Sequence, residues 1–176
     1  MSYLVIAAAV VVLFTFMARS IARKRQRERA SETARASVIG AYALDDVFVS
    51  DVDGSFVGLS SDGERVVVGR GEDSRAFPTT AIRAVEGVRD GVVLIRAEPD
   101  GDPVAPVPVA EQGVADAPDR IASLGLRLTV EDQVFDIVFH DTGRHGVSAD
   151  NAPFRKQAAL TEAWFRKLSS AMRRAG

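Results

Sequence analysis

Two apolar runs, Leu124-Gly-Leu-Arg-Leu-Thr-Val130 and Val134-Phe-Asp-Ile-Val-Phe-His140, decide the class of the fold. Only Glu131-Asp-Gln133 separates them, so the chain turns back at once and the two runs are expected to pair as antiparallel strands. Every second residue from Leu126 to Val130 is apolar and those between are polar, as in a strand with one buried face. The end of the chain therefore indicates a β domain.

The same pattern of short apolar runs separated by turns extends back towards the N-terminus. Asp-Gly pairs, which are typical of tight hairpin turns, stand at 53–54, 62–63, 90–91 and 100–101. The runs beside them predict strands at 55–60, 64–69, 81–89 and 92–96. A short element near Arg75-Ala-Phe77 brings the number of predicted strands to seven. Ile82 and Val85 break strict alternation, which predicts a bend or bulge.

One helix is predicted at the C-terminal end. Asp150 or Asn151 can cap it, and Pro153 stands in its first turn, where proline is tolerated. Arg166, Lys167, Arg173 and Arg174 are expected on its exposed face. The residues expected to form its apolar face are Phe154, Ala158, Leu160, Thr161, Trp164, Phe165, Leu168 and Met172.

Residues 98–119 hold five of the seven prolines, which remove donors from a strand ladder. We expect a long loop between the fifth and sixth predicted strands. An inert insertion is favoured over a proline-rich segment that binds a partner.

Seven antiparallel strands followed by one tryptophan-bearing helix resemble the pleckstrin-homology-like (PH-like) fold, in particular that of bacterial PH-like domains. The pieces that carry the resemblance are Phe48-Val-Ser50, Phe56-Val-Gly-Leu59, Ile82-Arg-Ala-Val-Glu86, Leu124-Gly-Leu-Arg-Leu128 and Leu160-Thr-Glu-Ala-Trp-Phe-Arg-Lys-Leu168. The resemblance covers residues 45–175 and implies an α+β, mainly β fold, in which a seven-stranded bent sheet or barrel is capped by the amphipathic C-terminal helix. It also implies a module that binds rather than catalyses. Its phosphoinositide-binding relatives carry basic residues in the loop that is Ser60-Ser-Asp-Gly63 here, so we do not carry that binding over.

The N-terminus has a different character. Residues 2–18 (SYLVIAAAVVVLFTFMA) are apolar on all sides and cover roughly 25 Å as a helix, and an extension to Ala22 spans a bilayer. A signal peptide would need a basic segment before this run, and a core helix of a soluble domain would be amphipathic. The sequence therefore favours an uncleaved transmembrane helix over residues 1–22, followed by a basic helical stalk over 23–44 and the PH-like domain over 45–176.

Charge predicts the orientation of this anchor. Residues 19–35 hold seven basic and two acidic side chains, a net of +5, and positive flanks stay in the cytoplasm. We expect a single-pass protein of the plasma (inner) membrane with its N-terminus outside and its C-terminal domain in the cytoplasm. The residues expected to contact the lipid surface are Arg19, Arg23, Lys24, Arg25, Arg27 and Arg29.

The overall net charge of −2 conceals an acidic body. Residues 154–176 carry +5, six basic against Glu162, so residues 36–153 carry −2 − 5 − 5 = −12. An acidic body argues against nucleic acid as a partner. The chain has no cysteine, which excludes disulfides and thiolate chemistry.

Two stretches could suggest metal sites. Asp51-Val-Asp53-Gly-Ser55 resembles the start of a calcium loop, but Phe56 stands where that loop needs glycine and no glutamate stands at its twelfth position. A simple turn is favoured. His140 and His145 lack a defined third ligand, so positions on a loop surface are favoured for both. We predict no metal site and no cofactor.

No catalytic constellation is apparent. Gly69-Arg-Gly71 lacks the following lysine and helix of a phosphate loop, and Ser60 and Ser61 lack a histidine partner. Trp164 is expected to serve the core. We therefore expect a membrane-anchored module that is not an enzyme and acts by protein–protein contact, as an accessory or assembly factor of a membrane complex whose partner the sequence does not name. The alternative is a protein that senses anionic lipid.

Overall fold

The computed structural model describes Thr33, Ala36 and residues 39–42, 44–71, 73–101 and 120–175. The predicted transmembrane helix, most of the predicted stalk and residues 102–119 of the proline-rich loop lie outside the described residues. Within the described part, residues 39–42 are helical and lead into the first strand.

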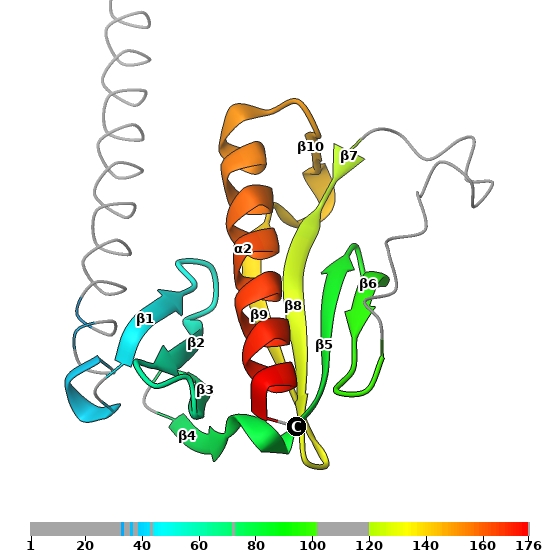
Figure 1. Cartoon of the computed structure of the whole chain (residues 1–176). Coiled ribbons are helices and arrows are strands. Elements are labelled where there is room, and N and C mark those ends of the chain that lie inside the picture. The colour runs from blue at the N-terminus through cyan, green and yellow to red at the C-terminus, as the bar shows by residue number, and fades with distance from the viewer. Residues whose placement is uncertain are drawn as a thin grey trace, which may run out of the picture.

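In the described part of the chain, two four-stranded antiparallel sheets and one long helix make up the fold (Figure 1). The first sheet has the strand order β1-β2-β3-β4 and the second the order β6-β5-β8-β9, while β10 and β7 form a short ladder of their own. The bounds are β1 Leu44–Val49, β2 Ser55–Ser60, β3 Arg65–Arg70, β4 Asp73–Pro78, β5 Ile82–Arg89, β6 Val92–Ala97, β7 Arg120–Ile121, β8 Ser123–Val130, β9 Gln133–Asp141, β10 Val147–Ser148 and α2 Ala152–Ala175, with 3-10 turns at η1 Thr79–Ala81 and η3 Gly143–His145.

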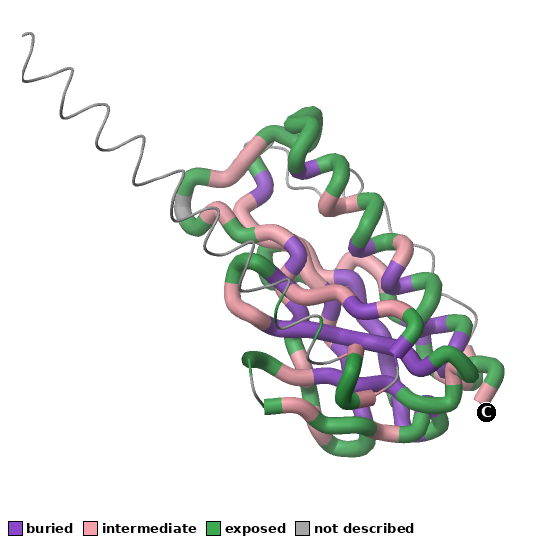
Figure 2. Tube along the Cα trace, turned by 90° about the vertical axis from the view of Figure 1, so that its left-hand side faces the viewer, coloured by how far each residue is buried: buried purple, intermediate pink, exposed green. Residues whose placement is uncertain are grey.

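Helix α2 lies across the inner face of the second sheet, against β5, β8, β9 and the turn η1 (Figure 1). Buried side chains from both sheets and the helix form the main core, and Figure 2 shows them gathered in the central strands while buried and exposed residues alternate along the helix. The largest of these, each with less than 2% of its surface exposed, include Ile82, Leu128, Phe139, Leu168 and Met172. Burial of this apolar surface is the main stabilising contribution.

The central strands of the first sheet, β2 and β3, are buried on both faces of the sheet. In β3, Val66 and Val68 join the main core, whereas Val67 points to the opposite face and packs with Phe56 of β2. A strand covered on both faces does not need polar residues at alternate positions, which explains the uninterrupted valine run. The outer face therefore needs a cover of its own, and residues 39–42 supply part of it.

The predicted hairpins are confirmed. The seven predicted strands correspond to β2, β3, β4, β5, β6, β8 and β9. The described residues contain three strands more, because β1 carries two aspartates and β7 and β10 have only two residues each. Strand β1 begins at Leu44, so it includes the last residue of the predicted stalk.

Local backbone features also follow the sequence. Asp90 and Gly91 both have positive φ, at 51° and 80°, as a tight hairpin turn between β5 and β6 requires. The pairing of β5 with β8 shifts register between Ile82 and Ala84, where the irregularity was predicted. The result is antiparallel sheets covered by a C-terminal helix, with an irregular register where β5 begins.

The helix agrees with its predicted pattern at all but one position. Asn151 caps it, because its Oδ1 accepts a hydrogen bond from the amide of Phe154 at 3.2 Å. Trp164 is 2% exposed and belongs to the main core, as predicted. Leu160 is 36% exposed, so its predicted place on the buried face is wrong. Each residue of an α-helix is rotated by about 100° from the one before it, which places Leu160 about 90° around the helix from the centre of its buried face. At that angle the side chain points past the edge of the sheets.

Candidate functional site

The residues predicted to contact the lipid surface, Arg19, Arg23, Lys24, Arg25, Arg27 and Arg29, lie outside the described residues. No helix in the described part of the chain is long and apolar enough to cross a membrane. The candidate sites within that part are the junction before β1, the polar turn after β1, and the charged faces of the second sheet and of α2.

The junction before β1 is fixed to the body. Ile39 and Tyr42 pack on the outer face of the first sheet, against a cluster that includes Leu44, Val47 and Phe56. The hydroxyl of Tyr42 also forms a hydrogen bond with the Oγ of Ser74 in β4, at 2.8 Å. The helical turn that precedes the body is therefore held to it by apolar contact and by one polar bond.

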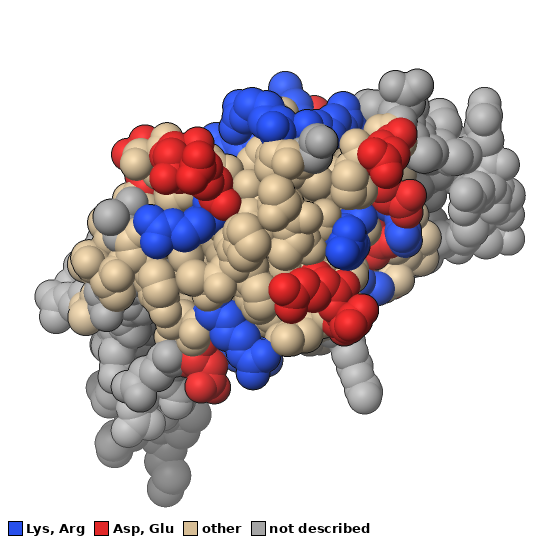
Figure 3. Space-filling view, turned by 60° about the horizontal axis from the view of Figure 1, so that its bottom comes forward, with Lys and Arg blue, Asp and Glu red and all other residues tan. Residues whose placement is uncertain are grey.

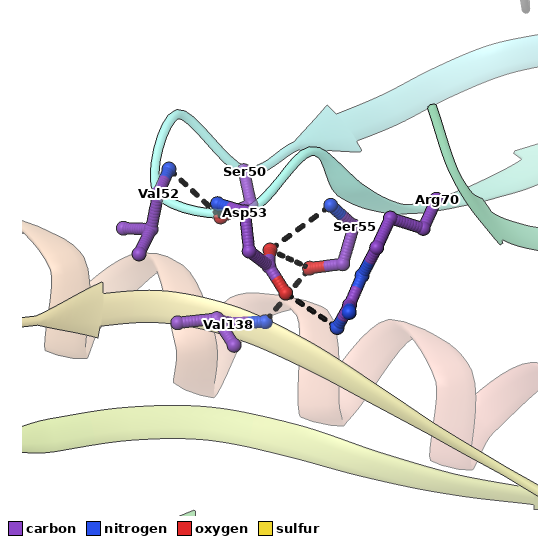
Figure 4. A network of polar contacts seen from close by, with 6 residues as sticks. All are labelled: Ser50, Val52, Asp53, Ser55, Arg70 and Val138. Atoms are coloured by element: carbon purple, nitrogen blue, oxygen red, sulfur yellow. Dashed lines mark hydrogen bonds and ion pairs between the residues drawn. The ribbon is translucent and has the colours of Figure 1, made fainter. Parts of the chain in front are cut away.

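The turn between β1 and β2 is the segment with the partial calcium-loop pattern, and Figure 4 shows its contacts. One carboxylate oxygen of Asp53 accepts hydrogen bonds from the amide of Ser55 at 3.0 Å and from its hydroxyl at 2.6 Å. The other oxygen pairs with Arg70 at 2.6 Å. The guanidinium thus occupies the side of the carboxylate where a cation would bind, and the turn interpretation agrees with the structure.

These contacts determine the ionisation of Asp53. Partial burial on its own would raise its pKa, but the hydrogen bonds from Ser55 and the charge of Arg70 outweigh burial and lower the pKa below its ordinary value. The charged form of Asp53 is therefore part of the folded structure.

The same turn joins the two sheets. The Oγ of Ser55 in β2 accepts a hydrogen bond from the amide of Val138 in β9, at 3.0 Å (Figure 4). Ser55 is 1% exposed, so this bond is shielded from water. The network that begins at Asp53 therefore has a structural role, which is to hold β2 against β9.

The two histidines do not form a common loop site. His140 lies in β9, which confirms its place at the end of the predicted strand 134–140 and shows that the loop position also predicted for it is wrong. Its ring contacts that of Phe154 edge-on, with the centroids 5.3 Å apart. His145 is exposed in the turn η3. Among the residues that the structure describes, no three histidine, aspartate or glutamate side chains lie together so that they could hold a metal ion.

Ser60, the last residue of β2, and Ser61, the residue after it, lie at the turn to β3. The hydroxyl of Ser60 is bonded to Asp62 and also accepts the amide of Arg65 at 2.9 Å, while Ser61 is exposed. The hydrogen bond from Ser60 and that from the amide of Glu64 lower the pKa of Asp62. Gly69-Arg-Gly71 forms the end of β3 and the turn after it. These contacts give Ser60 and Asp62 a structural role in the β2–β3 connection.

A row of ion pairs crosses the outer face of the second sheet. Arg96 of β6 pairs with Glu86 of β5 at 2.6 Å, and Arg127 of β8 pairs with Asp136 of β9 at 2.8 Å. The backbone register sets Glu86 directly opposite both Arg96 and Arg127. Glu86 is 6% exposed, so its charge is compensated by an arginine on each side.

The arginines of this row are stabilised in their charged form. The hydrogen bond to Glu98 is the largest influence on Arg96 and that to Asp136 the largest on Arg127, and both raise the pKa of the arginine. Sequence reasoning missed the row. The sequence does place opposite charges at positions 86, 96, 127 and 136. The pairing can be predicted from them only if β5 is already known to lie between β6 and β8.

The exposed face of α2 carries the predicted basic residues. Arg166 pairs with Glu162 at 3.0 Å, one turn away, and Lys167 pairs with Asp46 of β1 and lies over the ring of Trp164, 5.2 Å from its centroid. Within the described part of the chain, four further basic side chains of the helix have no ion-pair partner. They are Arg155, Lys156, Arg173 and Arg174.

Comparisons with known proteins give no relative. No family model, no curated protein and no solved structure matches this chain.

Proposed function

We propose that this chain is a single-pass membrane protein that presents a PH-like module to the cytoplasm and acts by contact with another protein, as an accessory or assembly factor of a membrane complex. The observation that carries the proposal is the junction before β1. Ile39 and Tyr42 are packed against the sheet, and the Tyr42–Ser74 bond adds a fixed direction. A body held in this way to the segment that leads to a membrane anchor would be displayed at a set orientation, as a docking module requires.

The arrangement of polar groups supports binding over catalysis. Asp53 is bonded to Ser55 and Arg70, Ser60 to its own turn, and Glu86 to Arg96. Side chains that are saturated in this way hold a scaffold together, whereas a catalytic base or nucleophile must be free to reach a substrate. The resemblance to PH-like domains, which rests on antiparallel sheets covered by a C-terminal helix, supports the same class of function.

In-cell photo-cross-linking of the full chain tests this proposal. A photoreactive residue is placed at Val92, Val134 or Leu160, which are 55%, 57% and 36% exposed and lie on three elements. We expect a discrete cross-linked membrane protein from at least one position, and none without irradiation. Cross-links to lipid alone from all three positions would contradict the proposal and favour the lipid-sensing alternative.

A C-terminal reporter tests the compartment. A fusion after Gly176 should be active only as a cytoplasmic reporter, because the net charge of +5 over residues 19–35 follows the apolar run directly. Strong alkaline phosphatase activity outside the cytoplasm would show that the predicted orientation is wrong.

A further inference from the structure

The basic residues of α2 form two parallel rows. Positions 11 and 18 residues apart fall within about 20° of one another around an α-helix. Arg155, Arg166 and Arg173 therefore share one line along the exposed face. The other line, displaced by about 100°, consists of Lys156, Lys167 and Arg174.

Small side chains lie between these rows. Ala159 and Ser170 are exposed and Ala163 is half-buried, and all three fall in the arc that separates the two lines. The rows run from Arg155 to Arg174, a length of roughly 27 to 29 Å along the helix axis. The two basic rows and the small side chains between them form a strip along the exposed face of the helix, which we call the α2 strip.

The α2 strip carries excess charge. The helix has six basic residues against one acidic residue, Glu162, and the pairs with Glu162 and Asp46 involve only Arg166 and Lys167. The remaining four cations, Arg155, Lys156, Arg173 and Arg174, have no ion-pair partner in the described part of the chain. An elongated anionic partner would complement this surface and would be attracted to it over long range.

The neighbourhood of the strip limits the width of that partner. Asp46 borders the strip at Lys167, and the guanidinium of Arg174 lies beside Gly63, whose neighbours are Asp62 and Glu64. Figure 3 shows basic and acidic groups alternating around the end of the molecule where the chain ends, separated by uncharged surface. These carboxylates border the row of Lys156, Lys167 and Arg174. A flat anionic bilayer pressed on α2 would also meet them, whereas a rod about 10 Å wide, such as one helix, would lie on the strip beside them.

We infer that the α2 strip is the docking surface for an acidic helical segment of a partner protein. The inference rests on the proposed function and deepens it, because it gives the chemistry of the partner. The glutamates or aspartates of the docked helix lie against the two basic rows, and its backbone approaches over Ala159 and Ser170. Each ion pair is exposed and individually weak, so the binding is the sum of several contacts and falls with rising salt.

The test uses the full chain in nanodiscs of phosphatidylcholine. The probe is a fluorescein-labelled helical peptide of about 18 residues, which matches the strip length at 1.5 Å per residue, with glutamate at every third or fourth position and alanine elsewhere. The test variant is Arg155→Gln/Lys156→Gln/Arg173→Gln. The matched control, Arg83→Gln/Arg89→Gln/Arg120→Gln, removes the same charge from β5 and β7.

Fluorescence anisotropy should show binding of the acidic peptide to the wild type and the control variant, and affinity lower by roughly tenfold or more for the test variant. Peptide with glutamine in place of glutamate should not bind, because it carries no negative charge. Circular dichroism melts of both variants should match the wild type, since five of the six substituted side chains are exposed and the sixth, Arg89, is half-buried.

Equal affinity of the test and control variants for the peptide would overturn the inference. The inference would also be overturned if the wild type and the control variant floated with vesicles of phosphatidylcholine and phosphatidylglycerol and the test variant did not. That result would assign the strip to a lipid surface. The proposed function is judged separately: if the test variant still gives the wild-type protein cross-link from Val92 or Val134, the module acts by protein contact and only its α2 strip is not the site.

Discussion

The hydroxyl oxygen of Ser55 in β2 accepts a hydrogen bond from the amide of Val138 in β9, a residue 83 positions further along the chain. Replacement of Ser55 by alanine leaves this amide without its partner and also removes the hydroxyl bond to Asp53. A buried donor without a partner costs about 1–3 kcal/mol, so Ser55→Ala should lower the free energy of unfolding by that amount. Urea denaturation measures it.

The control for this substitution is Ser61→Ala, which removes an exposed hydroxyl in the next turn and should change stability by less than about 0.5 kcal/mol. Equal effects of the two substitutions would mean that the Ser55–Val138 bond does not join the sheets.

Asp53 predicts a dependence of stability on pH. Its pKa in the folded protein is lowered below the unfolded value, so the unfolded state binds more protons between the two values and stability rises with pH across that window. The contribution of Asp53 is complete above an unfolded pKa of about 3.9 and is lost as the pH falls through the folded pKa. Asp53→Asn should therefore lower stability by about 1 kcal/mol at neutral pH and by progressively less as the medium becomes more acidic than the unfolded pKa.

Urea midpoints of the wild type and Asp53→Asn, measured from neutral to acidic pH, test this convergence. Arg70→Gln is the matched variant. It removes the ion pair but keeps both bonds from Ser55, so it should retain part of the pH dependence. A constant difference between wild type and Asp53→Asn at every pH would contradict the assignment.

The comparison of Trp164 with Leu160 tests which face of α2 is buried. Trp164 is 2% exposed in the main core, so Trp164→Ala should destabilise the protein by about 3 kcal/mol or more. Leu160 is 36% exposed, and Leu160→Ala should cost less than about 1 kcal/mol. Thermal melts measure both. A larger loss from Leu160→Ala than from Trp164→Ala would mean that the helix is rotated.

The hairpin between β8 and β9 contains a strained residue. Glu131 has φ of 53°, in the left-handed region that favours glycine, and its amide donates to the carbonyl of Ala81 at 2.9 Å. Glu131→Gly keeps that donor and removes the strain, so we expect a gain of about 0.5 kcal/mol in stability. Asp132→Gly, at a position without positive φ, should instead lose about 0.5 kcal/mol through chain entropy. Effects of the same sign would refute the assignment of strain to Glu131.

Features encoded by neighbouring residues could be predicted from the sequence. The Asp-Gly turns, the Asn151 cap, the irregularity at Ile82 and the core position of Trp164 each follow from a few adjacent positions. The predicted burial of Leu160 was wrong because this residue lies at the margin of the apolar face of the helix, where burial depends on how far the sheets extend. The loop position of His140 was wrong because this residue is the last of the apolar run 134–140, and β9 extends through it to Asp141.

The features that could not be predicted depend on which distant strands become neighbours. The Arg96–Glu86–Arg127–Asp136 row exists only because β5 lies between β6 and β8. The second cluster, which includes Phe56 and Val67, requires knowing that the segment before β1 folds back over the first sheet. Sequence periodicity reports that a face is apolar, and the tertiary fold determines what covers it.

The last prediction concerns anchoring. Residues 2–18 are seventeen mostly aliphatic residues, which would give an essentially irreversible insertion, whereas each arginine near an anionic surface adds only about 1 kcal/mol. We therefore expect removal of residues 1–18 to release a soluble, folded protein with its arginines intact. Replacement of Arg23, Lys24, Arg25, Arg27 and Arg29 by glutamine should leave the protein in the membrane with mixed orientation.

Fractionation at low and at high salt distinguishes anchoring by the apolar run from contacts made by the body. High salt screens the arginine contacts and leaves hydrophobic insertion intact, so the full chain should remain in the membrane under both conditions while the truncated protein is released. If the truncated protein stayed with membranes at high salt, the body would have a membrane or partner contact of its own that does not depend on charge. The apolar run would then not be the sole anchor. Because the α2 strip binds through exposed ion pairs, it could not explain such retention, and the exposed valines of the second sheet, Val92 and Val134, would be the first surface to test.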